Sequence, residues 1–187
     1  MDRPAIHTIG HSSRSAATLI TLLKRHDIRL LVDIRAFPRS RRYPQYNRAL
    51  LEDVLASREI GYHWSGDALG GFRKPRADSR HTALVDAAFR GFADYMESPA
   101  FHAAIDALLE RAHNRSLAVM CAEADYRHCH RQLIADHLLR RGVEVRHILG
   151  EGGWVTHRPH ACLDLEHEPS VYNKYAQCDL FAPDVDH

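Results

Sequence analysis

The sequence has few lysines, few cysteines and no long apolar run. No segment reaches the roughly 18 apolar residues of a membrane span, and residues 1–4 lead directly into a short apolar strand rather than a signal peptide. The formal net charge is +1, so the overall charge does not draw the chain to nucleic acid or to a membrane surface. These absences predict a soluble, cytoplasmic protein with no membrane partner.

The four cysteines could form two disulfides, but reduced thiols are expected in a chain of this size without an export signal. Lysine is largely replaced by arginine, since Lys24, Lys74 and Lys174 are the only lysines among 25 cationic residues. GC-rich coding explains most of this bias. Arginine also binds phosphate and carboxylate groups through paired hydrogen bonds, which matters wherever arginines cluster.

Short apolar segments alternate with helical patterns along a chain of ordinary globular composition, 45% hydrophobic and 26% charged. Strands are predicted at residues 5–9, 29–34, 61–64, 116–120 and 143–149. Helices are predicted at residues 15–26, 47–57, 84–96, 99–112 and 129–141. This alternation predicts a single α/β domain with a doubly wound, mostly parallel sheet in a Rossmann-like, three-layer arrangement.

Three regions lack such periodicity. Residues 35–45 form a polar loop with two prolines, and residues 67–81 form a long, irregular, basic loop that contains Gly70 and Gly71. Beyond Gly150 the pattern is weak, so residues 151–187 are predicted to be an irregular extension of a 1–150 domain. This extension would pack on the domain or on a second subunit.

Polar residues follow three of the predicted strands. They are Gly10-His11-Ser12, then Arg35, then Cys121-Ala122-Glu123. Ligands of doubly wound sheets bind outside the carboxyl ends of the strands, so these segments are expected to converge on one site.

The segment from Cys121 to Arg131, CAEADYRHCHR, carries the strongest chemical signal. A thiol between a buried strand and a helix N-terminus has its pKa lowered by backbone N–H groups, and the neighbouring arginines and histidines add to this effect. Cys121 is therefore a candidate nucleophile. The competing interpretation is a small core residue at a strand end.

Two other interpretations of this segment remain open. Cys121 and Arg127 have the C-x5-R spacing of cysteine phosphatases, although Glu123 and Asp125 within the loop would repel a phosphate dianion. Cys121, Cys129 and His130, with His11, have the ligand types of a zinc site but none of its usual spacings.

Arg131, in the first turn of the predicted helix, either contacts a ligand or forms a buried ion pair with Glu123. The segment from Arg35 to Tyr46 contains four arginines and two tyrosines, a composition that suits phosphate contact and base stacking but is also found in solvated loops. The Gly70-Gly71 segment could close over a ligand.

Together these motifs resemble one known family. The segments Thr8-Ile9-Gly10-His11-Ser12, Asp33-Ile34-Arg35 with Pro38 and Ser40, Leu69-Gly70-Gly71, and Cys121-Ala122-Glu123 with Cys129-His130-Arg131 are similar, in this order, to the bacterial and archaeal family called domain of unknown function 488. The resemblance runs from about Ile6 to Ile148 and implies a small cytoplasmic α/β domain. It brings no established activity, although some members are labelled as related to DNA repair.

The leading hypothesis is an enzyme that acts on an anionic substrate of the nucleotide or nucleic-acid type. In it, Cys121 is the nucleophile, His130 or His11 carries the proton, and Glu123 orients a neighbour or acts as base. The other hypotheses are a non-catalytic nucleotide or nucleic-acid binding module and a metal-binding protein centred on Cys121, Cys129 and His130. No cofactor is identified. The expected substrate-binding residues are Ser12, Arg35, Ser40, Tyr46, Gly70, Gly71, Cys129 and Arg131.

Overall fold

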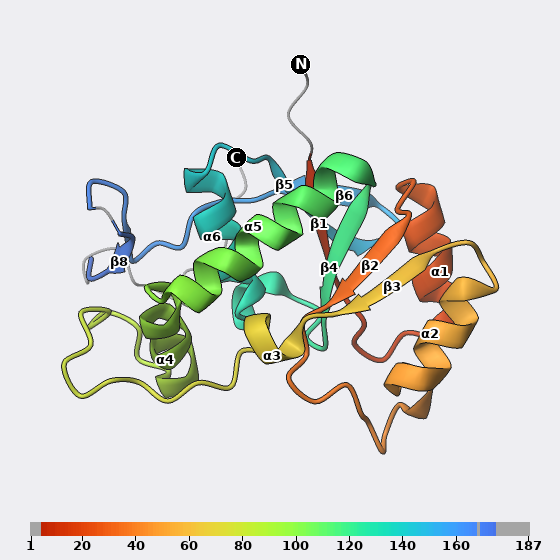
Figure 1. Cartoon of the computed structure of the whole chain (residues 1–187), viewed down its shortest axis with the longest axis horizontal. Helices are drawn as coiled ribbons and strands as arrows, with labels where there is room; N and C mark the ends of the chain where they lie inside the picture. The colour runs from red at the N-terminus through yellow and green to blue at the C-terminus, as the bar shows by residue number, and fades with distance from the viewer. Residues whose placement is uncertain (1–4, 168, 175–187) are drawn as a thin grey trace.

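The computed structural model of the chain describes residues 5–167 and 169–174. A six-stranded sheet has the order β3-β2-β4-β1-β5-β6, and β1 to β5 are parallel to their neighbours while β6 is antiparallel (Figure 1). The strands are β1 (Ile6–Gly10), β2 (Leu30–Asp33), β3 (Gly61–Trp64), β4 (Leu117–Cys121), β5 (Val145–Gly150) and β6 (Gly153–Thr156). The predicted doubly wound, mostly parallel sheet is confirmed.

Helices cover both faces of this sheet. They are α1 (Ala16–Arg25), α2 (Arg48–Ala56), α3 (Gly66–Leu69), α4 (Ala87–Met96), α5 (Pro99–Asn114) and α6 (Arg131–Arg140), with single 3-10 turns η1 (Pro44–Tyr46) and η2 (Tyr126–His128). The inner strands β2, β4 and β1 are buried along their whole length, as expected for parallel strands covered on both faces.

Alternate strand residues enter two hydrophobic clusters. Leu31 and Met120 pack with α1 and α2 on one face, while Val32 and Val119 pack with α4, α5 and α6 on the other. This separation follows from the two-residue period of a strand. The core therefore lies in two layers on either side of the sheet, and the carboxyl ends of the strands meet at the lower edge in Figure 1.

Two element boundaries differ from the predictions near the site. The predicted helix 129–141 begins only at Arg131, so Cys129 and His130 precede its first turn. The predicted irregular loop 67–81 is entered by the short helix α3. In addition, the chain beyond Gly150 begins with β6 at the sheet edge rather than with irregular structure.

The chain after β6 contributes to the core. Cys162, Leu163 and Tyr172 are buried in the same cluster as α4 to α6, and the last two belong to the hairpin β7 (Leu163–Asp164) and β8 (Val171–Tyr172). Within the described residues, no helix is both long and apolar enough to cross a membrane.

A buried row of polar side chains ties this C-terminal region to the sheet. Thr8 Oγ1 lies 2.7 Å from His147 Nδ1, and His147 Nε2 lies 2.9 Å from His157 Nδ1. The Asp136 carboxylate then accepts hydrogen bonds from His157 Nε2 at 2.8 Å and from the Tyr172 hydroxyl at 3.0 Å. We refer to these five residues as the histidine chain.

Candidate functional site

A cavity of about 570 Å³ opens at the carboxyl ends of β1, β2 and β4, where the sequence predicts a site. The loops after these strands line it, together with segments around Gly71, Phe89 and Cys129. The size is typical of pockets for small ligands. The three chain-distant polar segments therefore converge as the strand pattern predicts.

The loop after β1 is fixed to the loop after β4. The backbone N–H groups of His11 and Ser12 donate to the carbonyls of Cys121 and Ala122 at 2.9 and 2.8 Å. A Cβ atom at Gly10 would lie 1.7 Å from the Glu123 carbonyl oxygen, so only glycine allows this approach. Ser12 has a φ of 49°, a left-handed conformation that costs a non-glycine residue free energy and is often found at functional sites.

Arg35 is held by Asp33 rather than left free for an anion. Its guanidinium donates to both carboxylate oxygens of Asp33, at 2.9 and 2.6 Å, and to the Tyr46 carbonyl at 2.8 Å. Asp33 is fully buried and Arg35 is 6% exposed. Arg35 lines the cavity, but most of its donors are already used.

His11 is also fixed on both ring nitrogens. Its Nδ1 donates to the Ser12 carbonyl at 2.9 Å, and its Nε2 accepts from Arg35 Nη1 at 3.3 Å. Burial lowers the pKa of His11 to about 4. A neutral imidazole with no spare lone pair is a poor proton carrier. Its ring stacks on the Tyr46 ring, with centroids 4.0 Å apart, and Tyr46 lies outside the cavity lining.

Cys121 and Cys129 form a thiol pair at the cavity wall. Both are buried and carry free thiols, and their sulfur atoms lie no more than 4.8 Å apart. The expectation of reduced cysteines holds for this pair but is wrong for Cys162, which is disulfide-bonded.

The two members of the thiol pair have opposite pKa shifts. The adjacent Cys121 thiol, with contributions from His130 and Arg131, holds the pKa of Cys129 well below its ordinary value. The adjacent Cys129 and burial raise the pKa of Cys121 well above it. The prediction that Cys121 has a lowered pKa is therefore wrong, because the cationic neighbours contact the other sulfur.

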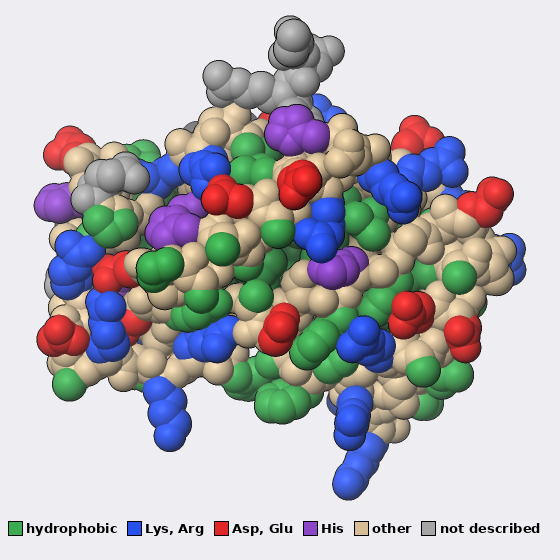
Figure 2. Space-filling model, in the orientation of Figure 1, with side chains coloured by type: hydrophobic (Ala, Val, Ile, Leu, Met, Phe, Trp, Pro, Cys, Tyr) green, Lys and Arg blue, Asp and Glu red, His purple; other side chains and the backbone are tan. Residues whose placement is uncertain are grey.

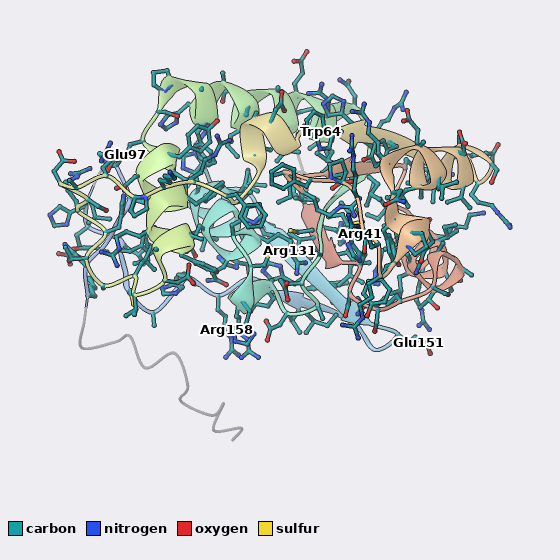
Figure 3. The ribbon with its side chains drawn as sticks, turned by 90° about the horizontal axis from the view of Figure 1, so that it is seen from below. Arg41, Trp64, Glu97, Arg131, Glu151 and Arg158 are labelled. Atoms are coloured by element: carbon teal, nitrogen blue, oxygen red, sulfur yellow. The ribbon has the colours of Figure 1, made fainter. Side chains whose placement is uncertain are left out.

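Arg131 is the largest fully buried side chain of the described residues, and none of them forms a salt bridge with it. Its donors contact the Glu123 and Ala124 carbonyls, the Thr8 hydroxyl at 3.5 Å and Cys129 Sγ at 3.5 Å. Figure 3 looks onto this edge from below, with Arg131 near its centre. Arg131 thus contacts the Glu123 backbone rather than the predicted carboxylate.

His130 is oriented by the chain preceding the cavity loop. Its Nε2 donates to the Leu69 carbonyl at 2.9 Å, which leaves Nδ1 facing Cys129 Sγ at 3.7 Å. A Cβ atom at Gly71 would lie 2.6 Å from His130 Nδ1, so Gly71 makes room for the ring. Gly70 lies outside the cavity lining and packs against Ala36 and Gly66.

The same atoms resemble a metal site. Ligand atoms of Cys121, Cys129 and His130 lie within 4.8 Å of one another, a set that suits zinc with one position open. A backbone carbonyl on the far ring nitrogen, here that of Leu69, is also usual for metal-bound histidine. However, two thiolates would only neutralise a divalent ion, and the buried Arg131 would remain uncompensated.

The cavity mouth combines cationic and aromatic side chains. We define the mouth by Phe37, Arg39, Arg42 and Phe72, all of which are exposed and line the cavity. The Phe37 and Phe72 rings lie 5.8 Å apart and come from different loops. Figure 2 shows cationic side chains that project from the lower edge, with hydrophobic ones between them.

The predicted site residues divide into two sets. Those that line the cavity are His11, Ser12, Arg35, Ser40, Gly71, Cys121, Glu123, Cys129 and His130, whereas Tyr46, Gly70 and Arg131 lie behind its wall. Sequence reasoning did not select Phe37, Arg39, Phe89 or His128 as site residues. Phe37 and Arg39 follow the end of β2 and His128 precedes α6, but their residue types are common in loops, whereas Phe89 lies in the first turn of α4.

One comparison with known proteins gives a match. Residues 15–138 match the family model described as "Domain of unknown function DUF488". No curated protein and no solved structure matches the chain.

Proposed function

We propose that this chain, which belongs to the family of domains of unknown function DUF488, is an enzyme that attacks an anionic substrate with the thiolate of Cys129. The observation that carries this proposal is the guanidinium of Arg131, which is 1% exposed and forms no ion pair with a carboxylate of the described residues.

A buried cation without an anion is strongly unfavourable. The backbone carbonyls that contact Arg131 offer only dipoles, whereas a deprotonated Cys129 supplies a full negative charge 3.5 Å from Arg131 Nε. The lowered pKa of Cys129, caused first by the adjacent Cys121 thiol, agrees with this charge balance. The thiolate then lies at the wall of the cavity, where a ligand reaches it.

His130 is the proton carrier in this proposal. Because its Nε2–H is engaged by the Leu69 carbonyl, its Nδ1 is the nitrogen that exchanges a proton with Cys129. With Cys129 already deprotonated, the neutral imidazole passes a proton between solvent and the leaving group of the substrate. Glu123, exposed at the cavity, remains a candidate base that orients a ligand group.

The mouth suits an anionic substrate of the nucleotide or nucleic-acid type. Arg39 and Arg42 form no ion pair with the described residues, so their charges are available to a phosphate. Phe37 and Phe72 offer exposed rings for a base. Some members of the family are labelled as related to DNA repair. Such a role for this chain would require that its substrate be nucleic acid.

The test is the pH dependence of iodoacetamide labelling, followed by mass spectrometry to separate Cys129 from Cys121. We expect the Cys129 rate to rise with a midpoint well below the ordinary thiol value of about 8.5, and the Cys121 rate to rise only above it. The midpoint is informative even though burial slows both rates. A Cys129 midpoint at or above the ordinary value would overturn the proposal.

Two alternatives give other results. A binding module without catalysis would bind nucleotides with the same salt dependence after Cys129→Ser, and no substrate would turn over in either form. A metal centre, which the three ligand atoms within 4.8 Å favour, would give near-stoichiometric metal by elemental analysis, and Cys129→Ser would remove it.

A further inference from the structure

The thiol pair contains a second sulfur that the proposed nucleophilic role does not use. The sulfur of Cys121 lies no more than 4.8 Å from Cys129 Sγ. Both residues line the same cavity. A thiol in contact with an attacking thiolate is in the position to capture any sulfur adduct that forms on it.

We propose that Cys121 and Cys129 form a reversible disulfide, and that the cavity reduces small disulfides that carry carboxylate groups. This inference rests on the proposed role of Cys129 as the attacking thiolate. It adds a second catalytic residue, Cys121, and a second class of substrate to that role.

The reaction takes two steps. Cys129 Sγ, already a thiolate, attacks one sulfur of the small disulfide, so a Cys129–sulfur bond forms and the substrate's own sulfur–sulfur bond breaks. The first thiolate leaves and takes from solvent the proton that Cys129 had released. Cys121 then gives its proton to His130 Nδ1 and attacks Cys129 Sγ, which expels the second thiolate. His130 returns the proton to a departing thiolate. The thiol pair loses two electrons and the small disulfide gains them.

The arrangement of charges assigns the order of attack. Arg131 and His130 contact the sulfur of Cys129, at 3.5 and 3.7 Å, and stabilise it as an anion. Cys121 keeps its proton until Cys129 has lost its negative charge to the adduct, after which the raised pKa of Cys121 is no longer supported by a neighbouring thiolate. Attack by Cys121 therefore follows, and does not precede, attack by Cys129.

The cavity favours a small, negatively charged disulfide over a protein one. Its volume of about 570 Å³ is that of a small-molecule pocket, and Cys121 and Cys129 are 9% and 3% exposed, so a protein surface does not reach their sulfur atoms. Arg39 and Arg42 at the mouth offer cations for the carboxylates.

The test uses the full chain and glutathione disulfide as the probe. After incubation, the thiols are blocked with N-ethylmaleimide and the peptides are mapped by mass spectrometry. We expect wild-type protein to lose two hydrogens through a Cys121–Cys129 disulfide that dithiothreitol reverses. Cys121→Ser and Cys121→Ala should instead retain one glutathione on Cys129, with an adduct more than about tenfold higher than in wild type, because attack by a neighbouring thiol outruns attack from solution.

The outcomes separate this inference from the proposed function. If wild type and both Cys121 variants retain the Cys129 adduct equally, the disulfide activity is overturned while Cys129 remains a nucleophile. If Cys129 forms no adduct in any variant but labels with iodoacetamide at low pH, the small-disulfide substrate class is wrong. If Cys129 labels with neither reagent below the ordinary thiol pKa, the proposed function itself fails. Circular dichroism confirms that each variant is folded.

Discussion

Two buried polar clusters lie on either side of Arg131, and only one of them opens to a cavity. The thiol pair with His130 faces solvent-accessible space, whereas the histidine chain from Thr8 to Tyr172 is enclosed. Arg131 contacts both, through Cys129 Sγ and through Thr8 Oγ1. In the enclosed cluster each carboxylate oxygen of Asp136 accepts from a neighbour, so its polar groups stabilise the fold, while the open cluster keeps a sulfur for a ligand.

Removal of the carboxylate at Asp136 should have the largest effect on stability. Asp136→Ala leaves His157 Nε2, the Tyr172 hydroxyl and the His160 N–H without their buried acceptor, so we expect a loss of about 3–5 kcal/mol in the free energy of unfolding. Urea denaturation measures it. Asp106→Ala, which removes an exposed partner of Arg141, is the matched control and should cost less than about 1 kcal/mol. Equal losses would show that the histidine chain is no more important than a surface pair.

The enclosed cluster should also make stability sensitive to acid. Burial lowers the pKa of His147 from 6.5 to about 2, so the folded state binds fewer protons than the unfolded state in this range. Stability is therefore fully present above pH 6.5 and falls as the pH is lowered toward 2. His147→Gln should reduce the slope below pH 6.5 by about 1.4 kcal/mol per pH unit, measured by urea denaturation.

The region above pH 6.5 is the internal control for this variant, because His147 is neutral there in both states. If the free energy of unfolding of His147→Gln falls with the same slope below pH 6.5 as that of the wild type, another group causes the acid sensitivity. His11, whose pKa is lowered to about 4 by burial, contributes in the same direction but only down to that pH.

The open cluster should respond in reactivity more than in stability. In Gly71→Ala the new Cβ atom displaces the His130 ring from its position beside Cys129, so we expect Cys129 labelling at neutral pH to fall by about tenfold, which corresponds to 1.4 kcal/mol. Gly150→Ala is the control, because a Cβ atom there meets nothing within 4 Å. Similar labelling rates of the two variants would show that the position of His130 does not affect the reactivity of Cys129.

The smallest effect is expected at the mouth. Arg39→Ala removes an exposed cation, so stability should change by no more than about 0.5 kcal/mol. Binding of an anionic ligand should weaken several-fold and become less dependent on salt, measured by titration calorimetry with nucleotides. Arg58→Ala, at another exposed arginine that lies outside the cavity lining, should leave binding unchanged. The same loss in both variants would indicate a general charge effect.

The sequence predicts the sheet and the location of the cavity because both depend on local patterns. Continuous apolar segments such as residues 29–34 and 116–120 predict covered parallel strands, and the position of a residue after such a strand predicts the edge on which it lies. The predictions for Gly10, Arg35 and Cys121 needed nothing more.

Which sulfur has the lowered pKa could not be predicted in this way. It depends on the side chain of Arg131, which folds back past Cys129 toward Thr8, and on the 3-10 turn η2 that delays the start of α6. Likewise, the sequence predicted that Arg35 binds a ligand, but in the structure Arg35 pairs with Asp33. Such a pair at a strand end forms only if both side chains turn in the same direction, which the sequence pattern does not specify.

The position of β1 bears on how the protein can be divided for expression. The family match begins at residue 15 and ends at residue 138, yet β1 lies in the middle of the sheet between β4 and β5. A fragment cut at the limits of the match would lose its central strand, leave the β4 backbone unpaired along one side, and expose apolar surface to other copies. The recognisable part of the sequence is thus smaller than the unit that must be synthesised for the thiol pair to be studied.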